Sequence, residues 1–123
     1  MTEENVILYE KLYKEFYDTC EHIAQILNEY EYFRQFNILD AETYTLETDD
    51  VWYEGRDRYD DCICGAFDRK YLTMTDGQIR KSAKQKNDEY LAELERKKEK
   101  NKAAKENAEY QQYLTLKQKF ENS

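Results

Sequence analysis

Four residues of the chain carry groups that bind zinc in proteins: Cys20, His22, Cys62 and Cys64. A structural zinc site takes four such ligands in a tetrahedron. Cys20 and His22 lie two residues apart in a segment with helical periodicity, so their side chains point roughly 200° apart around the helix axis and do not meet at one ion. Cysteine pairs in zinc sites usually leave about two to four residues between them, whereas Cys62 and Cys64 leave one. We therefore predict that the protein holds no metal and needs no cofactor.

The stretch DDCICGAF, residues 60–67, also lacks the features of a catalytic thiol. A thioredoxin-type redox pair has about two intervening residues and lies at a helix N-terminus, but this stretch has the composition of a strand. A disulfide between neighbours on one face of a strand would be strained. Nucleophilic hydrolysis requires a base, usually histidine, next to a serine or cysteine, and His22 falls at the edge of a polar helix face. The sequence therefore favours a protein that is not an enzyme.

Acidic and aromatic residues alternate around this stretch and favour a binding surface. The candidate contacts with a partner are Trp52, Tyr53, Asp57, Tyr59, Asp60 and Asp61. Tyrosine and tryptophan give rigid contact area with a polar tip, which suits protein interfaces, and carboxylates spaced among them can occupy a groove built for phosphates. The alternative interpretation is structural, because acids on a hairpin edge prevent edge-to-edge pairing of sheets and tyrosines half-bury on a domain with few aliphatic residues.

A long helix is the first element that the sequence predicts. Apolar residues recur at alternating spacings of three and four from Val6 to Tyr30, which is the period of a helix. Further apolar residues, among them Leu12 and Tyr17, widen this stripe beyond the seam of a two-stranded coiled coil. We expect one helix over residues 4–36 that is buried along a broad face.

A β-hairpin should follow this helix. Residues 43–54 and 59–67 switch to a period near two and are rich in β-forming residues, and the polar stretch GRDR, residues 55–58, predicts the turn between them. With this turn, one face of the hairpin carries Tyr44, Leu46, Trp52, Ile63 and Phe67. The other face then carries Val51, Tyr53, Cys62, Cys64 and Ala66. A bulge near Asp49–Asp50 would exchange part of the two sets.

The last segment predicts a second long helix. Thr75 and Gln78 form a capping-box pattern at its start, and apolar residues continue on one face to about residue 94. Residues 95–107 contain no apolar side chain larger than alanine, which is typical of a solvated helix.

A short apolar patch follows near the end of the chain. It consists of Tyr113, Leu116 and Phe120, and we predict that it mediates oligomerisation, although it could also fold back or bind another partner. The chain thus divides into a compact helix–hairpin–helix domain, residues 1–94, and a helical extension, residues 95–123. The predicted fold class is α+β, with a long N-terminal helix packed on a β-hairpin and followed by a long charged C-terminal helix.

Charge is unevenly distributed along the chain. Residues 1–67 carry 17 acids and 5 bases, whereas residues 68–123 carry 10 acids and 14 bases. The acidic half disfavours direct binding of nucleic acid, while the basic run from Arg96 to Lys105 could contact phosphates or form a solvated helix face. We therefore expect a protein, or a protein–nucleic-acid complex, as the partner, with a second copy of the chain as the alternative.

Several features bear on the compartment in which the protein works. No apolar run approaches the length of a membrane-spanning helix, so we expect no membrane association. The start, MTEENVILYEKLYKEF, lacks the basic residues and small-residue cleavage site of a signal peptide. Three cysteines without a secretory signal are best explained as reduced thiols. These features predict a cytoplasmic protein.

Two motifs give the chain a resemblance to a known class. VWYEG at residues 51–55 and YLTMTDGQI at residues 71–79 make residues 43–94 resemble small uncharacterised accessory proteins of tailed phages and prophages. The motifs are structural and specify no activity. The resemblance implies a protein of an infected or lysogenic bacterium that binds and inhibits a host protein; anti-CRISPR proteins and other anti-defence inhibitors belong to that class. Two alternatives remain, namely an oligomeric scaffolding protein that assembles through its C-terminal helix and a nucleic-acid binder that uses its basic run.

Overall fold

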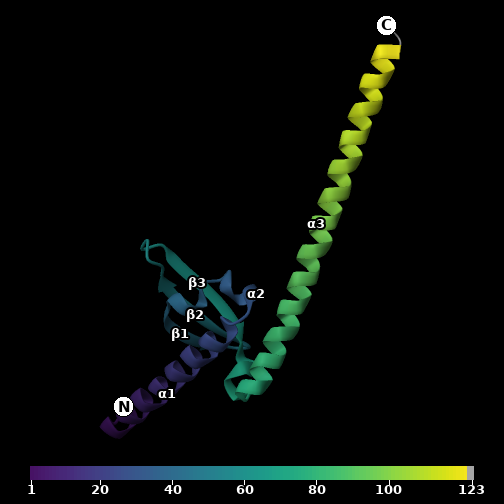
Figure 1. Ribbon diagram of the computed structural model, residues 1–123. Coiled ribbons are helices and arrows are strands. Elements are labelled where there is room, and N and C mark those ends of the chain that lie inside the picture. Colours follow the sequence, from purple (N-terminus) through teal and green to yellow (C-terminus); the bar gives the residue numbers. More distant parts are fainter. Residues whose placement is uncertain (122–123) are drawn as a thin grey trace. The chain divides into compact units, whose positions relative to one another are not determined.

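The fold class is α+β, as the sequence predicts. In the computed structural model (Figure 1), a long N-terminal helix, a three-stranded antiparallel sheet and a long C-terminal helix follow one another along the chain. The structure describes the backbone of residues 1–121 and the side chains of residues 1–119. The chain divides into two compact units, of which the first spans Met1–Asn87 and the second begins at Asp88.

The N-terminal helix, α1, spans Glu3–Leu27 and is buried only in its second half. Thr2 caps its start, because the Thr2 hydroxyl accepts a hydrogen bond from the Asn5 backbone amide at 3.2 Å. Its buried residues are Cys20, Ile23, Ala24, Ile26 and Leu27. The expectation of burial along the whole helix is wrong, since Tyr9 is 62% and Leu12 53% exposed. A 25-residue helix is about 37 Å long, whereas strands of seven residues span only about 24 Å.

The prediction of a helix that continues to residue 36 is also wrong. The chain leaves the helix after Leu27, and a short helix, α2, spans Glu31–Arg34. The Arg34 guanidinium stabilises this break, because it donates to the backbone carbonyls of Asn28 and Glu29 at 3.0 and 2.8 Å. Carbonyl groups at a helix end have no partner within the helix, and Arg34 supplies one.

The sheet has three strands where a two-stranded hairpin was predicted. Strands β1 (Ala41–Glu47), β2 (Asp50–Arg56) and β3 (Cys62–Asp68) pair antiparallel in the order β1-β2-β3. The stretch predicted as one strand, residues 43–54, reverses at Thr48, whose φ of 47° lies in the left-handed region. A β-branched residue rarely adopts that conformation; the aspartates at 49 and 50, where the sequence also allowed a bulge, are the only turn-forming residues at this point.

This extra turn changes which side chains share a face of the sheet. One face packs on the helices and contains Tyr44, Val51, Tyr53, Ile63 and Phe67, all of which are buried. The predicted grouping of Trp52 with this set is wrong: Trp52 lies on the opposite, open face and is 46% exposed. The β2–β3 loop also occupies residues 57–61 rather than 55–58, and moving a loop by one residue exchanges the two faces of a strand.

The C-terminal helix, α3, spans Asp76–Glu121, and two short 3-10 helices, Ile38–Asp40 and Arg69–Thr73, flank the sheet. The predicted capping box is confirmed. The backbone amide of Gln78 donates to the Thr75 hydroxyl at 3.3 Å, and the backbone amide of Thr75 donates to the side-chain oxygen of Gln78 at 3.0 Å.

The first turns of α3 pack on the rest of the first unit. Ile79 and Ala83 are buried in its core. His22 of α1 lies 2.9 Å from Asp76, and the Tyr32 amide donates to the Asn87 side chain at 2.9 Å. The predicted end of the compact domain, residue 94, therefore lies inside α3 beyond the last residue of this unit.

Among the described residues, no helix combines the length and the apolar character that crossing a membrane requires.

Candidate functional site

The loop between β2 and β3, residues 57–61, brings most of the predicted contact residues together. Asp57 organises it: one carboxylate oxygen of Asp57 accepts hydrogen bonds from the backbone amides of Tyr59 and Asp61 at 2.8 and 3.0 Å. The Asp57 amide donates to the Asp61 carbonyl at 3.0 Å, and the Asp60 amide donates to the Asp57 carbonyl at 3.0 Å. An aspartate that bonds to amides a few residues ahead stabilises a turn, so these bonds favour the turn conformation seen in residues 57–61.

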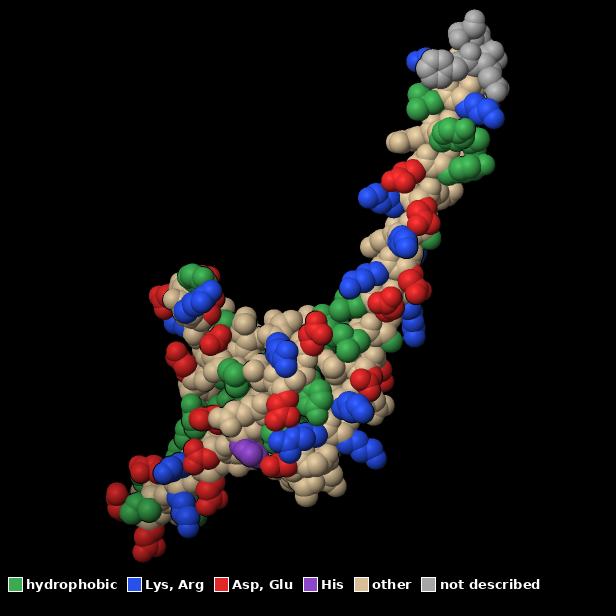
Figure 2. Space-filling model, viewed as in Figure 1, with side chains coloured by type: hydrophobic (Ala, Val, Ile, Leu, Met, Phe, Trp, Pro, Cys, Tyr) green, Lys and Arg blue, Asp and Glu red, His purple; other side chains and the backbone are tan. Residues whose placement is uncertain are grey.

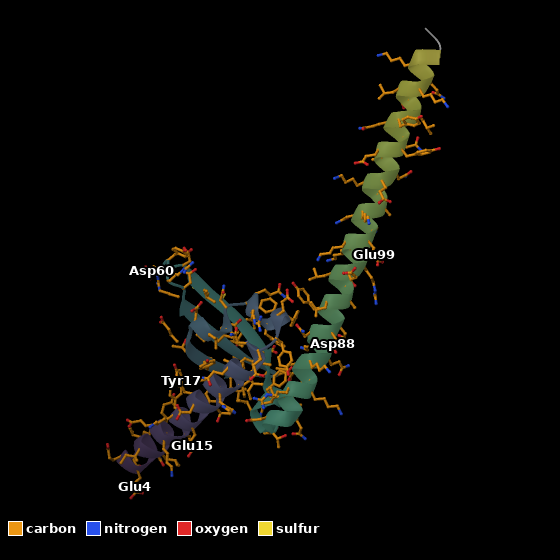
Figure 3. All side chains as sticks on the ribbon, in the orientation of Figure 1. Glu4, Glu15, Tyr17, Asp60, Asp88 and Glu99 are labelled. Carbon is orange, nitrogen blue, oxygen red and sulfur yellow. The ribbon has the colours of Figure 1, made fainter. Side chains whose placement is uncertain are left out.

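The remaining charged groups of the loop are exposed and weakly paired. Arg56 lies 3.3 Å from the Asp60 carboxylate, with side chains 59% and 83% exposed, and an ion pair that exposed contributes less than about 1 kcal/mol. The Arg58 guanidinium lies 4.8 Å above the Tyr59 ring, while Tyr59 itself is 70% exposed. Figure 3 shows Asp60 at the tip of the loop. The loop therefore presents an aromatic ring and carboxylates to solvent.

Two predicted contact residues lie outside the loop, and one of them is not on the surface. Tyr53 points into the core with 3% of its surface exposed, and its hydroxyl donates to the Phe36 carbonyl at 3.1 Å. Burial raises the pKa of the Tyr53 hydroxyl. Because its side chain is enclosed, Tyr53 cannot serve as a partner contact, and the prediction is corrected on this point. Trp52, on the other face of the same strand, remains available.

The open face of the sheet connects Trp52 to the loop. In the register of β2 and β3, Trp52 pairs with Ala66, and Glu54 pairs with Cys64. All four residues are exposed. Alternation along β2 alone places Glu54 on the same face as Trp52. The position of Cys64 on this face depends on the register of β2 and β3, and the incorrect position of the predicted loop concealed it.

The three cysteines are free thiols in two separate environments. Cys20 is completely buried in α1, whereas Cys62 and Cys64 lie exposed on the open face of β3. Burial raises the pKa of the Cys20 thiol to about 12, so this thiol stays protonated. In the part of the chain that the structure describes, no three histidine, cysteine or acidic side chains converge as a metal site would require.

A hollow of about 360 Å³ lies between α2 and the sheet. Its lining includes Tyr32, Phe36, Tyr53, Phe67 and Lys86. Tyr53 and Phe36, whose carbonyl accepts the hydrogen bond of the Tyr53 hydroxyl, both line this hollow, so the predicted contact residue Tyr53 faces the interior rather than the loop surface.

The predicted oligomerisation residues lie in the second unit. Tyr113 is 61% and Leu116 57% exposed on α3, while the Phe120 side chain lies outside the described residues. Tyr110, which the prediction did not include, is 59% exposed and adjoins Tyr113 at helical spacing.

Comparison of the chain with family models, with curated proteins and with solved structures finds no match.

Proposed function

We propose that the protein is a non-enzymatic binding protein that presents the β2–β3 loop and the adjoining open sheet face to a basic surface of a protein partner. The observation that carries this proposal is the combination of an aromatic ring that is 70% exposed, at Tyr59, with a loop whose backbone is held by its own hydrogen bonds. A loop that is ordered before binding loses little conformational entropy when a partner engages it.

The chemistry of this surface indicates the kind of partner. Tyrosine and tryptophan are enriched among the residues that dominate protein interfaces, and Tyr59 and Trp52 are both accessible. Asp60 and Asp61 add negative charge beside them. A partner with lysine and arginine around an apolar depression complements this surface, and carboxylates there would compete with nucleic-acid phosphates for the same groove.

In its most specific form, the proposal is a phage-type accessory protein that inhibits a host nuclease or another defence complex. The support for this form is the resemblance of residues 43–94 to phage accessory proteins, together with the acidic aromatic loop. The location would then be the cytoplasm of the bacterial host.

Affinity capture from a bacterial lysate tests the proposal, with the full chain immobilised and bound proteins eluted by rising salt. Asp61→Lys is the informative charge variant, because the Asp57 carboxylate, not that of Asp61, holds the loop. Asp88→Lys, on an exposed helix position, is the matched control with the same change of charge.

We expect a captured partner to be released as salt rises above physiological strength, and its affinity to fall at least about tenfold with Asp61→Lys and with Tyr59→Ala. Asp88→Lys should bind like the wild type. A partner that binds all three variants equally, or that stays bound at about 1 M salt, would exclude this loop as the binding surface.

A further inference from the structure

The N-terminal half of α1 carries an exposed apolar stripe. Leu8, Tyr9, Leu12 and Tyr13 are 53%, 62%, 53% and 41% exposed. At about 100° per residue, Tyr9, Leu12 and Tyr13 lie on the same side of α1 as the buried Cys20, so the stripe prolongs the core-facing side of the helix past the sheet. Contiguous apolar side chains that stay exposed on one side of a helix are a common feature of interaction sites.

The charges around the α1 stripe restrict what can cover it. Residues 3–18 contain five acids and two bases, and Figure 2 shows acidic side chains among the hydrophobic ones at this end of the molecule. Two α1 segments from different copies would therefore repel each other, and so would an anionic membrane surface. The stripe requires an occupant that is apolar and basic.

The second unit of the chain has these properties. The apolar patch of α3, defined as Tyr110, Tyr113 and Leu116, is exposed at every position by 57–61%. Residues 95–119 surround it with eight bases and four acids. The residues around the α3 patch therefore carry a net charge opposite to that of the residues around the α1 stripe. The α3 patch residues recur every three positions, as apolar residues do in α1.

We propose that a second copy of the chain covers the α1 stripe, with α3 of one copy packed antiparallel along α1 of another. If Tyr9 is placed beside Tyr113, an antiparallel arrangement brings Val6 to the level of Leu116. The same arrangement brings Leu12 to the level of Tyr110 and Leu8 to the level of Leu114, whereas Tyr13 falls at the level of Glu109. This assembly goes beyond the proposed function and uses a different surface from the β2–β3 loop.

The charges agree with the same arrangement. It brings Glu3, in the first turn of α1, to the level of Lys119, in the last turn of α3. It brings Asp18 close to Lys105 in the same way. Antiparallel packing also places the positive end of one helix dipole beside the negative end of the other. In a closed symmetric dimer the contact would form twice.

Sedimentation of the full chain tests this proposal. The wild type should show an average mass that rises with concentration above the 15.0 kDa of the monomer. Leu12→Glu and Tyr113→Lys should each remain at 15.0 kDa over the same range, with the circular dichroism of the wild type, because both side chains are exposed. Ile7→Glu is the control, since Ile7 is 58% exposed but lies about 140° around the helix from Leu12; it should associate like the wild type.

A mixture of the two variants identifies the pairing. The Leu12→Glu chain retains an intact α3 patch, and the Tyr113→Lys chain retains an intact α1 stripe. An equimolar mixture should therefore associate although neither variant does so alone. A wild type that stays monomeric overturns the proposal. This result is expected if α3 packs on α1 of its own chain, or if neither surface binds protein. An effect of only one of the two substitutions, or a mixture that remains monomeric, also overturns the proposal.

Discussion

Replacement of Gly55 by alanine should destabilise the first unit strongly. A Cβ atom at this position would overlap the carbonyl oxygen of Asp40 and would lie 2.9 Å from the carbonyl carbon of Asp40 and 3.0 Å from the backbone nitrogen of Glu42. The register of β1 and β2 shifts between Ala41 and Thr43, which is where the backbone of β1 approaches Gly55. Because the neighbours are backbone atoms, no change of side-chain rotamer can relieve the overlap.

The magnitude follows from the distances. Nonbonded carbon atoms normally lie about 3.5–4.0 Å apart, so the carbonyl carbon of Asp40 would have to move by roughly 0.5–1 Å and the overlapping carbonyl oxygen by more than that. Overpacking of this kind costs about 1–3 kcal/mol, and more where the backbone must move. We expect about 3 kcal/mol for Gly55→Ala. In a unit of this size, 1 kcal/mol changes the melting temperature by about 4–8 °C, which gives a decrease of about 12–24 °C.

Thermal and urea unfolding, followed by circular dichroism, measures this effect. Gly77→Ala is the matched control, because no atom lies within 4 Å of its added Cβ and Gly77 is in the first turn of α3. Alanine is the better helix former, so this control should unfold at the same or a higher free energy, by up to about 1 kcal/mol. If Gly55→Ala unfolds within about 0.5 kcal/mol of the wild type, the close approach of β1 to Gly55 is wrong.

Four further predictions concern thiol reactivity, pH dependence, a turn and a helix cap. A thiol reagent should modify Cys62 and Cys64 in the native protein and Cys20 only after unfolding, because Cys20 is 0% exposed; three reactive thiols in the native state would contradict the packing of α1. Burial raises the pKa of the Cys20 thiol from 9.0 to about 12. The unfolded state therefore loses this proton first, and the free energy of unfolding, which is constant in this respect below pH 9, falls by up to about 1.4 kcal/mol per pH unit as the pH rises toward 12. Cys20→Ala should flatten this slope in urea titrations at different pH values, and an unchanged slope would assign the pH dependence to other groups. Thr48→Gly should raise the free energy of unfolding by about 1 kcal/mol, because a φ of 47° is unfavourable for threonine. Thr75→Ala should lower the free energy of unfolding by about 1 kcal/mol, because the α3 cap is lost. A change of the opposite sign in either unfolding experiment would refute the corresponding geometry.

The sequence was sufficient for the elements that depend on local pattern. The period of apolar residues predicts α1, and the spacing of Thr75 and Gln78 predicts the start of α3, because helical periodicity and capping act over a few residues. The end of α1 was not predictable in this way. Aromatic residues continue at helical spacing to Phe33, and the break depends on Arg34 reaching back to the carbonyls of Asn28 and Glu29.

The candidate site was predicted in part, for a related reason. Asp57, Tyr59, Asp60 and Asp61 meet because they are close in sequence and share one loop. Trp52 and Tyr53 are neighbours in one strand and therefore point to opposite faces of the sheet, so only one of them could lie on the open face. Which face is buried depends on packing against the helices, and local pattern does not give it; in the structure Tyr53 is the buried residue of the two.

The order of the strands has a consequence for how the protein folds. Each strand pairs with the next one along the chain, so the sheet can form from short loops with little entropic penalty. The contacts that join α1 and α2 to α3 are different: His22 meets Asp76 across 54 residues, and Tyr32 meets Asn87 across 55. Closing these longer loops costs less conformational entropy once the sheet between them has formed. We therefore expect the meander to form early and the docking of the two helices to limit the folding rate, so that substitutions at Ile79 should slow folding more than substitutions at the tip of the β2–β3 loop.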